Sequence, residues 1–270
     1  DHLDFFKDLD DIRHSFRRYA ELIPEDGALV INSDIDNLDY FTEGLKCNII
    51  TVGSDPEKSM YSAANITYDE FARGSYDLVV NGETKTHIVL KVTGEHNIYN
   101  SLASIAAAHF MGIDDNSIIA GLQQYGGTDR RFQYKGKLGD ITVIDDYAHH
   151  PDEIRATIKT ANIIHTRRCG LFSSHIHIQE LRLYFLSLQK HYQRLTLLFL
   201  QIFTQQRERY SRNQLKRCYE GIKKLGTEAY YFPSFSEIEN FLLENCSTGD
   251  LLITMGAGDV VKIGEHLLGN

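Results

Sequence analysis

Short, largely apolar runs alternate with helix-like segments along most of this 270-residue chain. Residues 28–32, 48–52, 141–144 and 251–254 are such runs, and each has the length of one buried strand. Strands that are apolar on both faces are typical of a parallel sheet covered by helices on both sides. The alternation therefore predicts an α/β fold that binds ligands at the carboxyl ends of its strands.

The order of the segments predicts two domains. Two β-rich runs flank an Asn-Gly pair at residues 81 and 82, which is a hairpin signal, and an Ala-rich helical segment follows at residues 97–112. Glycines and paired arginines then occupy residues 127–131, after a completed helix, and favour a boundary there. We expect one domain over residues 1–128 and a second α/β domain over residues 129–270.

Composition excludes several classes of function. Lys and Arg number 28 against 37 Asp and Glu, so the formal net charge is -9, which argues against a broad nucleic-acid-binding surface. No apolar run approaches the ~20 residues that a membrane-spanning helix needs. The four cysteines form no CxxC pair. We therefore expect a cytoplasmic protein with reduced thiols, no nucleic-acid partner and no membrane insertion, while the oligomeric state stays open.

The most specific motif lies at the start of the Ala-rich helix, where Asn97 and Asn100 are three positions apart. If the helix begins near Asn97, the two amides lie about one turn apart at its N-terminal end. An amide offers a donor and an acceptor together, which suits the edge of an adenine base. A helix cap with one buried asparagine is the alternative interpretation.

A second polar cluster runs from Asp145 to Pro151, directly after an apolar run, and holds two aspartates, a tyrosine and two histidines. Proline is favoured in the first turn of a helix, so the cluster lies at a strand-to-helix connection. There an aspartate can accept from a ribose hydroxyl, a tyrosine can stack, and a histidine titrates near neutrality. The alternative is a polar helix cap rich in histidine.

Two further motifs are weak by themselves. Arg130 and Arg131 precede Phe132 and could place a guanidinium on a phosphate or carboxylate, although exposed arginine pairs are common. A glycine turn at residues 255–259 lets backbone amides approach an anion, although such turns often only join a strand to a helix.

Together these motifs resemble the Mur ligase family. Gly-x-His-Asn-x-x-Asn before an Ala-rich helix is shared across that family. Asp-Asp-Tyr-Ala-His-His-Pro after Arg-Arg-Phe, and Thr-Met-Gly-Ala-Gly-Asp near the end of the chain, point to its alanine-adding members, as does Asp-His-Leu-Asp at residues 1–4. The resemblance implies the back half of a central ATP-binding domain followed by a Rossmann-like C-terminal α/β domain.

The resemblance also implies where the nucleotide and metal bind. His2 would be a ligand of Mg²⁺, and Asn97 and Asn100 would lie at the adenine of ATP. Arg131 would reach the nucleotide phosphates.

Three further roles follow from the same resemblance. Asp146 and Tyr147 would hold the nucleoside, and His149 would face the amino-acid side of the cleft, so Arg131 and His149 are the residues implied in catalysis. The substrates would be UDP-N-acetylmuramate and L-alanine. The muramyl carboxylate would attack the γ-phosphate of ATP to give an acyl phosphate, and the amine of L-alanine would then displace phosphate to form the amide. Mg²⁺ and cationic side chains would neutralise charge on the transferring phosphoryl group.

Two parts of the family are missing from this sequence. It contains no Gly-rich loop that ends in Lys-Ser or Lys-Thr, and nothing resembles the domain that holds the UDP-sugar. Both would lie before Asp1. We therefore expect a C-terminal fragment of a ligase that is inactive by itself.

Residues 172–206 depart from the family pattern internally, because they contain no Gly, Ala, Val or Asp. The family has Phe-Gln-Pro-His-x-Tyr-Thr-Arg where this chain has Phe-Ser-Ser-His-Ile-His-Ile-Gln. Codons permitted for this stretch read Phe-Gln-Pro-His-Thr-Tyr-Thr-Arg when translated from the third base, and the same shift lets residues 201–206 encode Asp-Ile-Tyr-Ala-Ala. We interpret the segment as the product of two compensating frameshifts, in the gene or in its sequencing, rather than of ordinary divergence. Leu and Gln are good helix formers, so we expect a helix over residues 181–203 and irregular chain beyond it.

Two alternatives remain open. One is another Mur-type ligase, of the murein-peptide recycling or folylpolyglutamate-synthetase kind, although the motifs after Arg131 favour the alanine-adding members. The other is a non-catalytic remnant with weak nucleotide binding, which the absence of a P-loop favours.

Overall fold

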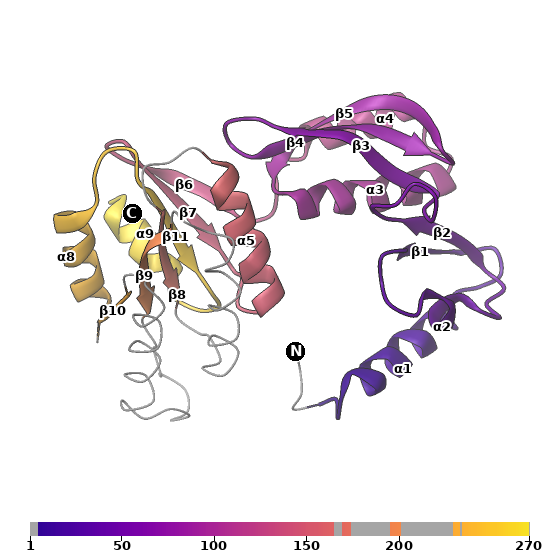
Figure 1. Ribbon diagram of the computed structural model, residues 1–270, viewed down its shortest axis with the longest axis horizontal. Helices are drawn as coiled ribbons and strands as arrows, with labels where there is room; N and C mark the ends of the chain where they lie inside the picture. The colour runs from indigo at the N-terminus through magenta and orange to yellow at the C-terminus, as the bar shows by residue number, and fades with distance from the viewer. Residues whose placement is uncertain (1–4, 165–168, 174–194, 201–228, 233, 270) are drawn as a thin grey trace. The chain divides into compact units, whose positions relative to one another are not determined.

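The computed structural model describes residues 5–164, 169–173, 195–200, 229–232 and 234–269. The chain divides into two compact units, Asp1–Gly126 and Gly127–Asn270. Each unit is built around one mixed sheet (Figure 1). The α/β fold that the apolar runs predict is confirmed in both.

The first unit has five strands in the order β1-β2-β3-β4-β5. Strands β1, β2 and β3 run parallel to one another, and β3, β4 and β5 form an antiparallel meander. Its elements are, in chain order, α1 (Leu9–Ala20), β1 (Ala28–Asn32), α2 (Leu38–Thr42), β2 (Asn48–Val52), β3 (Tyr61–Tyr68), β4 (Arg73–Val80), β5 (Glu83–Thr93), α3 (Glu95–Phe110) and α4 (Asp115–Gln124).

The predicted hairpin is confirmed at Asn81 and Gly82, which alone join β4 to β5. Both residues have positive φ, 50° and 79°, as a two-residue turn with the twist of a hairpin requires. The Ala-rich helix α3 packs on the sheet, and its Ile98, Leu102 and Ile105 are at most 1% exposed. These contacts fix the start of α3, and with it the two asparagines, against the sheet.

The second unit has six strands in the order β10-β9-β8-β11-β7-β6, parallel except for the edge strand β6. Its described elements are β6 (Gln133–Leu138), β7 (Ile141–Asp146), α5 (Pro151–Ile163), β8 (Cys169–Ser173), β9 (Leu195–Leu200), β10 (Ala229–Tyr231), α8 (Phe235–Asn245), β11 (Leu251–Met255) and α9 (Val261–Leu267). Non-sequential neighbours in a parallel sheet are the pattern of a doubly wound domain.

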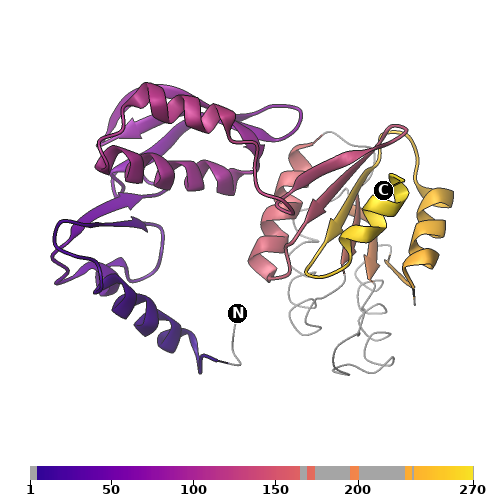
Figure 2. The same ribbon diagram turned by 180° about the vertical axis from the view of Figure 1, so that it is seen from behind.

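Helices cover both faces of this sheet. Val143 of β7 and Leu252 of β11 share a buried core with Ile238 of α8 and Ile263 of α9, and α5 lies on the opposite face (Figures 1 and 2). This two-sided cover explains why β7 and β11 read as continuous apolar runs. It also leaves the carboxyl ends of β7 and β11 side by side, since Met255 pairs with Asp146.

The prediction of a helix over residues 181–203 is wrong for the part of it that the structure describes. Leu195–Leu200 forms strand β9, which pairs in parallel with β8 on one side and β10 on the other. Ladder hydrogen bonds to two neighbouring strands override the helix propensity of leucine, because propensity is worth only a few tenths of a kcal/mol per residue. The rest of the expected helix and residues 201–206 lie outside the described residues.

Within the described part of the chain, no helix combines the length and apolar character needed to cross a membrane.

Candidate functional site

The cluster from Asp145 to Pro151 lies where a strand gives way to a helix. Strand β7 ends at Asp146, and α5 begins at Pro151 with His150 as its N-cap residue. The glycine turn that follows β11 lies beside it, because Gly256 donates its N–H to the carbonyl of Asp146 at 2.8 Å. The predicted placement at the carboxyl edge of the sheet is therefore confirmed.

Asp146 is almost fully buried, at 6% exposure, and both carboxylate oxygens are engaged. Its Oδ1 accepts from the Ala148 N–H at 3.0 Å, and its Oδ2 accepts from Oγ1 of Thr157 at 2.6 Å. Burial raises the pKa of Asp146 above its usual value, while the hydrogen bonds from Thr157 and Ala148 and the charge of Arg131 act in the opposite sense. The side chain fixes the loop to α5, and a second lone pair on each oxygen remains for a ligand hydroxyl.

Tyr147 and His149 lie on the loop itself. Their rings are 5.5 Å apart and nearly perpendicular, and Nδ1 of His149 lies 3.1 Å from the carbonyl of Tyr147. Tyr147 is 36% exposed, so its ring offers surface to a stacking partner. Nδ1 of His149 also lies 3.5 Å from Oε2 of Glu153.

Glu153 connects the loop to Arg131. Its Oε2 accepts from the N–H groups of His149 and His150, in a capping box at the start of α5, and its Oε1 lies 3.3 Å from Nη1 of Arg131. Burial acts to raise the pKa of Glu153, but the backbone N–H groups and Arg131 outweigh it and hold that pKa below its usual value. Arg131, whose side chain is 54% exposed, is thus held at the loop with its charge still accessible to an anion.

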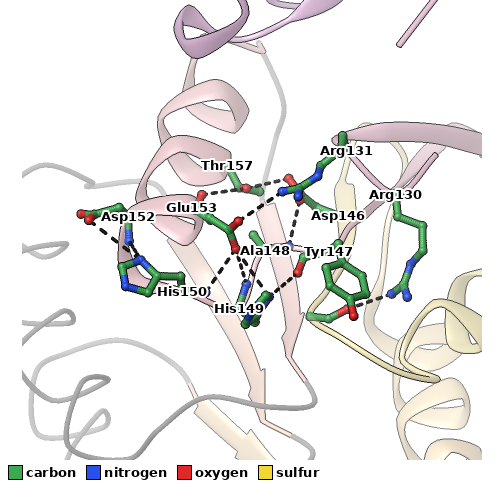
Figure 3. Close-up of polar contacts among 11 residues, drawn as sticks. Arg130, Arg131, Asp146, Tyr147, Ala148, His149, His150, Asp152, Glu153 and Thr157 are labelled. Carbon is green, nitrogen blue, oxygen red and sulfur yellow. Dashed lines mark hydrogen bonds and ion pairs between the residues drawn. The ribbon is translucent and has the colours of Figure 1, made fainter. Parts of the chain in front are cut away.

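The sequence motif included a second arginine, Arg130, but its separate role at this edge was missed. Arg130 points away from Arg131 and toward Tyr147 (Figure 3), and its Nε donates to Oδ2 of the fully buried Asp145 at 2.8 Å. Arg130 has a φ of 59°, in the left-handed region, and its side chain contacts different partners from that of Arg131. The available signal was Asp145, the first aspartate of the Asp-Asp pair, since a buried carboxylate needs a partner.

The two asparagines of the first unit lie together at the start of α3, as expected. Asn100 donates from Nδ2 to Oδ1 of Asn97 at 3.1 Å, and Asn97 donates from Nδ2 to the carbonyl of Thr93 at 2.8 Å. Asn97 is half-buried and Asn100 is exposed. The pair is therefore preorganised, and Asn100 retains an acceptor and a donor position for a ligand.

The predicted metal ligand His2 lies outside the described residues. Among the residues that are described, no group of three His, Cys, Asp or Glu side chains is arranged to hold a metal ion. The described cysteines Cys47, Cys169 and Cys246 are free thiols.

Each of the two units matches a domain of known proteins. Residues 1–108 match the Mur ligase middle domain, and residues 130–258 match the Mur ligase glutamate ligase domain. The chain belongs to the Mur ligase family. A relative from Lachnospira eligens, a UDP-N-acetylmuramate–L-alanine ligase, is 49% identical to this Mur ligase chain over 271 residues, which cover 99% of the chain and 59% of the relative.

Solved Mur ligase structures share the fold. A UDP-N-acetylmuramate-alanine ligase, MurC, from Thermotoga maritima aligns with a TM-score of 0.78 at 23% identity, over 100% of this chain and 56% of that chain. A MurF ligase from Thermotoga maritima in complex with ADP aligns with a TM-score of 0.71 at 15% identity, over 99% of this chain and 58% of that one. This Mur ligase chain thus spans less than two thirds of the length of each of these proteins.

Proposed function

We propose that this chain is part of an ATP-dependent ligase that joins L-alanine to UDP-N-acetylmuramate in peptidoglycan precursor synthesis. The observation that carries the proposal is the intact Asp146-to-Glu153 loop at the carboxyl ends of β7 and β11, in a chain 49% identical to an alanine-adding ligase. The likeness to a ligase with bound ADP supports nucleotide binding. We place the reaction in the cytoplasm, where ATP and the UDP-linked substrate are found.

Each unit contributes different groups to this function. In the first unit, Asn97 and Asn100 would meet the adenine with their paired amides. In the second, Asp146 would accept from a ribose hydroxyl and Tyr147 would stack on the base. These groups bind and orient the nucleotide, and orientation is a large part of what a ligase supplies to phosphoryl transfer.

The charged groups of the loop would act on the transferring phosphoryl group. Arg131 would leave Glu153 and bind the phosphates, since a guanidinium fork fits a phosphate better than the single 3.3 Å contact that it makes here. His149 would face the amino acid, and its contact with Glu153 would orient the ring. Bound Mg²⁺ would neutralise phosphate charge, and His2 is the residue proposed to hold it.

A chimeric ligase tests the proposal. The region of the Lachnospira eligens ligase that precedes the matched stretch is joined to this chain, once as it stands and once with residues 172–206 read in the shifted frame. We expect the shifted-frame chimera to release phosphate only when UDP-N-acetylmuramate, L-alanine, ATP and Mg²⁺ are all present. A His2→Ala version should need more Mg²⁺.

Three results would contradict the proposal. A preference for murein peptides or for a glutamate-tailed folate would assign the chain to another Mur-type ligase. Nucleotide binding without turnover in the shifted-frame chimera would identify a non-catalytic remnant. Absence of nucleotide binding in a folded chimera would show that the chain does not contribute to an ATP-dependent ligase.

A further inference from the structure

We propose that Arg130 is a positioning residue that holds the ring of Tyr147 as a stacking platform for the nucleotide base, an inference that rests on the proposed nucleotide binding. The guanidinium carbon of Arg130 lies 4.8 Å from the centroid of the Tyr147 ring. A cation stacked on one ring face is attracted by the negative face of the π-system. The contact therefore restrains the ring of a residue that is otherwise partly exposed.

The guanidinium is itself held by a buried ion pair. Nε of Arg130 donates to Oδ2 of Asp145 at 2.8 Å, and Oδ1 of Asp145 accepts from Oγ1 of Thr254 at 2.7 Å. Asp145 and Thr254 are both 0% exposed. Both oxygens of this carboxylate thus have fixed partners at a position buried from solvent, where charge-assisted hydrogen bonds are strongest.

Arg130 also joins three segments that are distant in sequence. Its Nη2 donates to the carbonyl of Gly256 in the turn after β11 at 2.8 Å, and its own carbonyl accepts from the N–H of Tyr147 at 2.7 Å. The loop before β6, the end of β7 and the glycine turn are therefore fixed to one another through a single residue. Figure 3 shows Arg130 reaching Tyr147 from the side away from Glu153.

This arrangement separates the roles of the two neighbouring arginines. The side chain of Arg130 is 24% exposed and directs its hydrogen bonds inward, whereas that of Arg131 is 54% exposed and lies beside the loop. Arg131 can therefore exchange its carboxylate partner for a phosphate. Arg130 acts on the ligand only through Tyr147, so its loss should weaken recognition of the base and not of the phosphates.

The first measurement needs no nucleotide. In the 270-residue chain with ¹³C-labelled tyrosine, the ring signal of Tyr147 is assigned by Tyr147→Phe and followed in Arg130→Lys. We expect the signal to shift and to show increased ring motion, because a lysine ammonium keeps the charge but not the flat stacking surface. The matched control, Arg155→Lys on the exposed side of α5, should leave the signal unchanged.

The second measurement uses ADP and inorganic tripolyphosphate as probes. We expect Arg130→Lys to weaken ADP binding about tenfold, within the range for one stacked base, and tripolyphosphate binding less than twofold. The effects of Arg130→Lys and Tyr147→Leu on ADP binding should not add, because both changes remove the same platform. If Arg130→Lys does not fold, Arg130→Met with Asp145→Asn removes the buried charges together and is measured in its place.

Two results would overturn the proposal: an unchanged Tyr147 signal in the folded variant, or equal loss of ADP and tripolyphosphate binding. If neither the wild-type chain nor the folded chimeric ligase binds ADP, the proposed nucleotide function fails. The Tyr147 signal still decides, independently of that result, whether Arg130 positions the ring.

Discussion

Thr157 donates from Oγ1 to Oδ2 of Asp146 at 2.6 Å, and this contact joins the second turn of α5 to the last residue of β7. The carboxylate is 6% exposed. Its ionised form has therefore lost most of its water, and the hydrogen bonds from Thr157 and Ala148 do not restore an ordinary pKa. Keeping this carboxylate ionised in the folded protein therefore costs stability.

Asp146→Asn should make the second unit more resistant to unfolding near neutral pH while removing nucleotide binding. The pKa of Asp146 is raised in the folded state, so its contribution to stability is complete below the unfolded value near 3.8 and is lost as pH rises through the folded value. The stability of the variant relative to wild type should thus increase with pH and then level off. Urea unfolding between pH 4 and 8, monitored by hydrogen exchange of amides in the second unit, measures this difference in stability. The exposed Asp152→Asn serves as the control, and a variant less stable than wild type at neutral pH would contradict the prediction.

Two substitutions of Glu153 should distinguish the stability that comes from helix capping from the stability that comes from its charge. Glu153→Gln keeps an acceptor for the N–H groups of His149 and His150 and should cost less than about 0.5 kcal/mol, because a partly exposed ion pair contributes little. Glu153→Ala removes the cap and should cost about 1 kcal/mol. The lowered pKa of Glu153 means that its contribution is present above the unfolded value near 4.5 and is lost as pH falls through the folded value. Equal losses in the two variants at pH 7 would show that the cap is unimportant.

Replacing each of two glycines of the first unit by alanine should change the stability of the unit in opposite directions. Gly82 has a φ of +79° in the hairpin turn, so Gly82→Ala should destabilise the unit by about 1 kcal/mol. Gly121 lies inside α4, and a Cβ added there would enter open space. Gly121→Ala should therefore stabilise the unit by about 0.5–1 kcal/mol. Denaturant unfolding of the two variants beside wild type decides both signs.

The 270-residue chain alone should not ligate L-alanine to UDP-N-acetylmuramate. Its sequence contains no Gly-rich loop ending in Lys-Ser or Lys-Thr, the motif that holds the β- and γ-phosphates in P-loop enzymes. Correct positioning of reacting groups can be worth ~7–11 kcal/mol, and weak binding to the remaining groups does not replace it. A phosphate-release assay with both substrates, ATP and Mg²⁺ should give no alanine-dependent signal. Turnover near that of an intact ligase would show that the catalytic groups have been misplaced.

The gene should reveal the origin of residues 172–206. We expect codons that read Phe-Gln-Pro-His-Thr-Tyr-Thr-Arg in the shifted frame, with the original frame restored near Arg207. Resequencing the coding region from several independent clones provides the test. Codons incompatible with the shifted reading would leave ordinary divergence as the explanation.

Several features of this protein follow from short stretches of sequence. Apolar runs at 141–144 and 251–254 indicated the buried parallel strands, and the Asn-Gly pair after β4 indicated its turn, because these signals depend on neighbouring residues and backbone conformation. The pairing of Asn97 with Asn100 also followed from helical spacing. The strand at Leu195–Leu200 did not, because its hydrogen bonds come from β8 and β10, which are distant in the chain.

Only the tertiary structure decided which charged residues at this edge of the sheet are buried and which stay exposed. The family resemblance gave roles to Arg131 and Asp146, but nothing in the local sequence indicated what their neighbours Arg130 and Asp145 do. Folding buries Asp145 completely and directs Arg130 onto it, while Arg131 stays exposed beside Glu153. The distinction arises because β11 and its glycine turn, more than a hundred residues away, supply Thr254 and the Gly256 carbonyl that complete the buried pair. A local pattern can name the residues that bind charge, but burial by distant segments determines which of them remain available to a ligand.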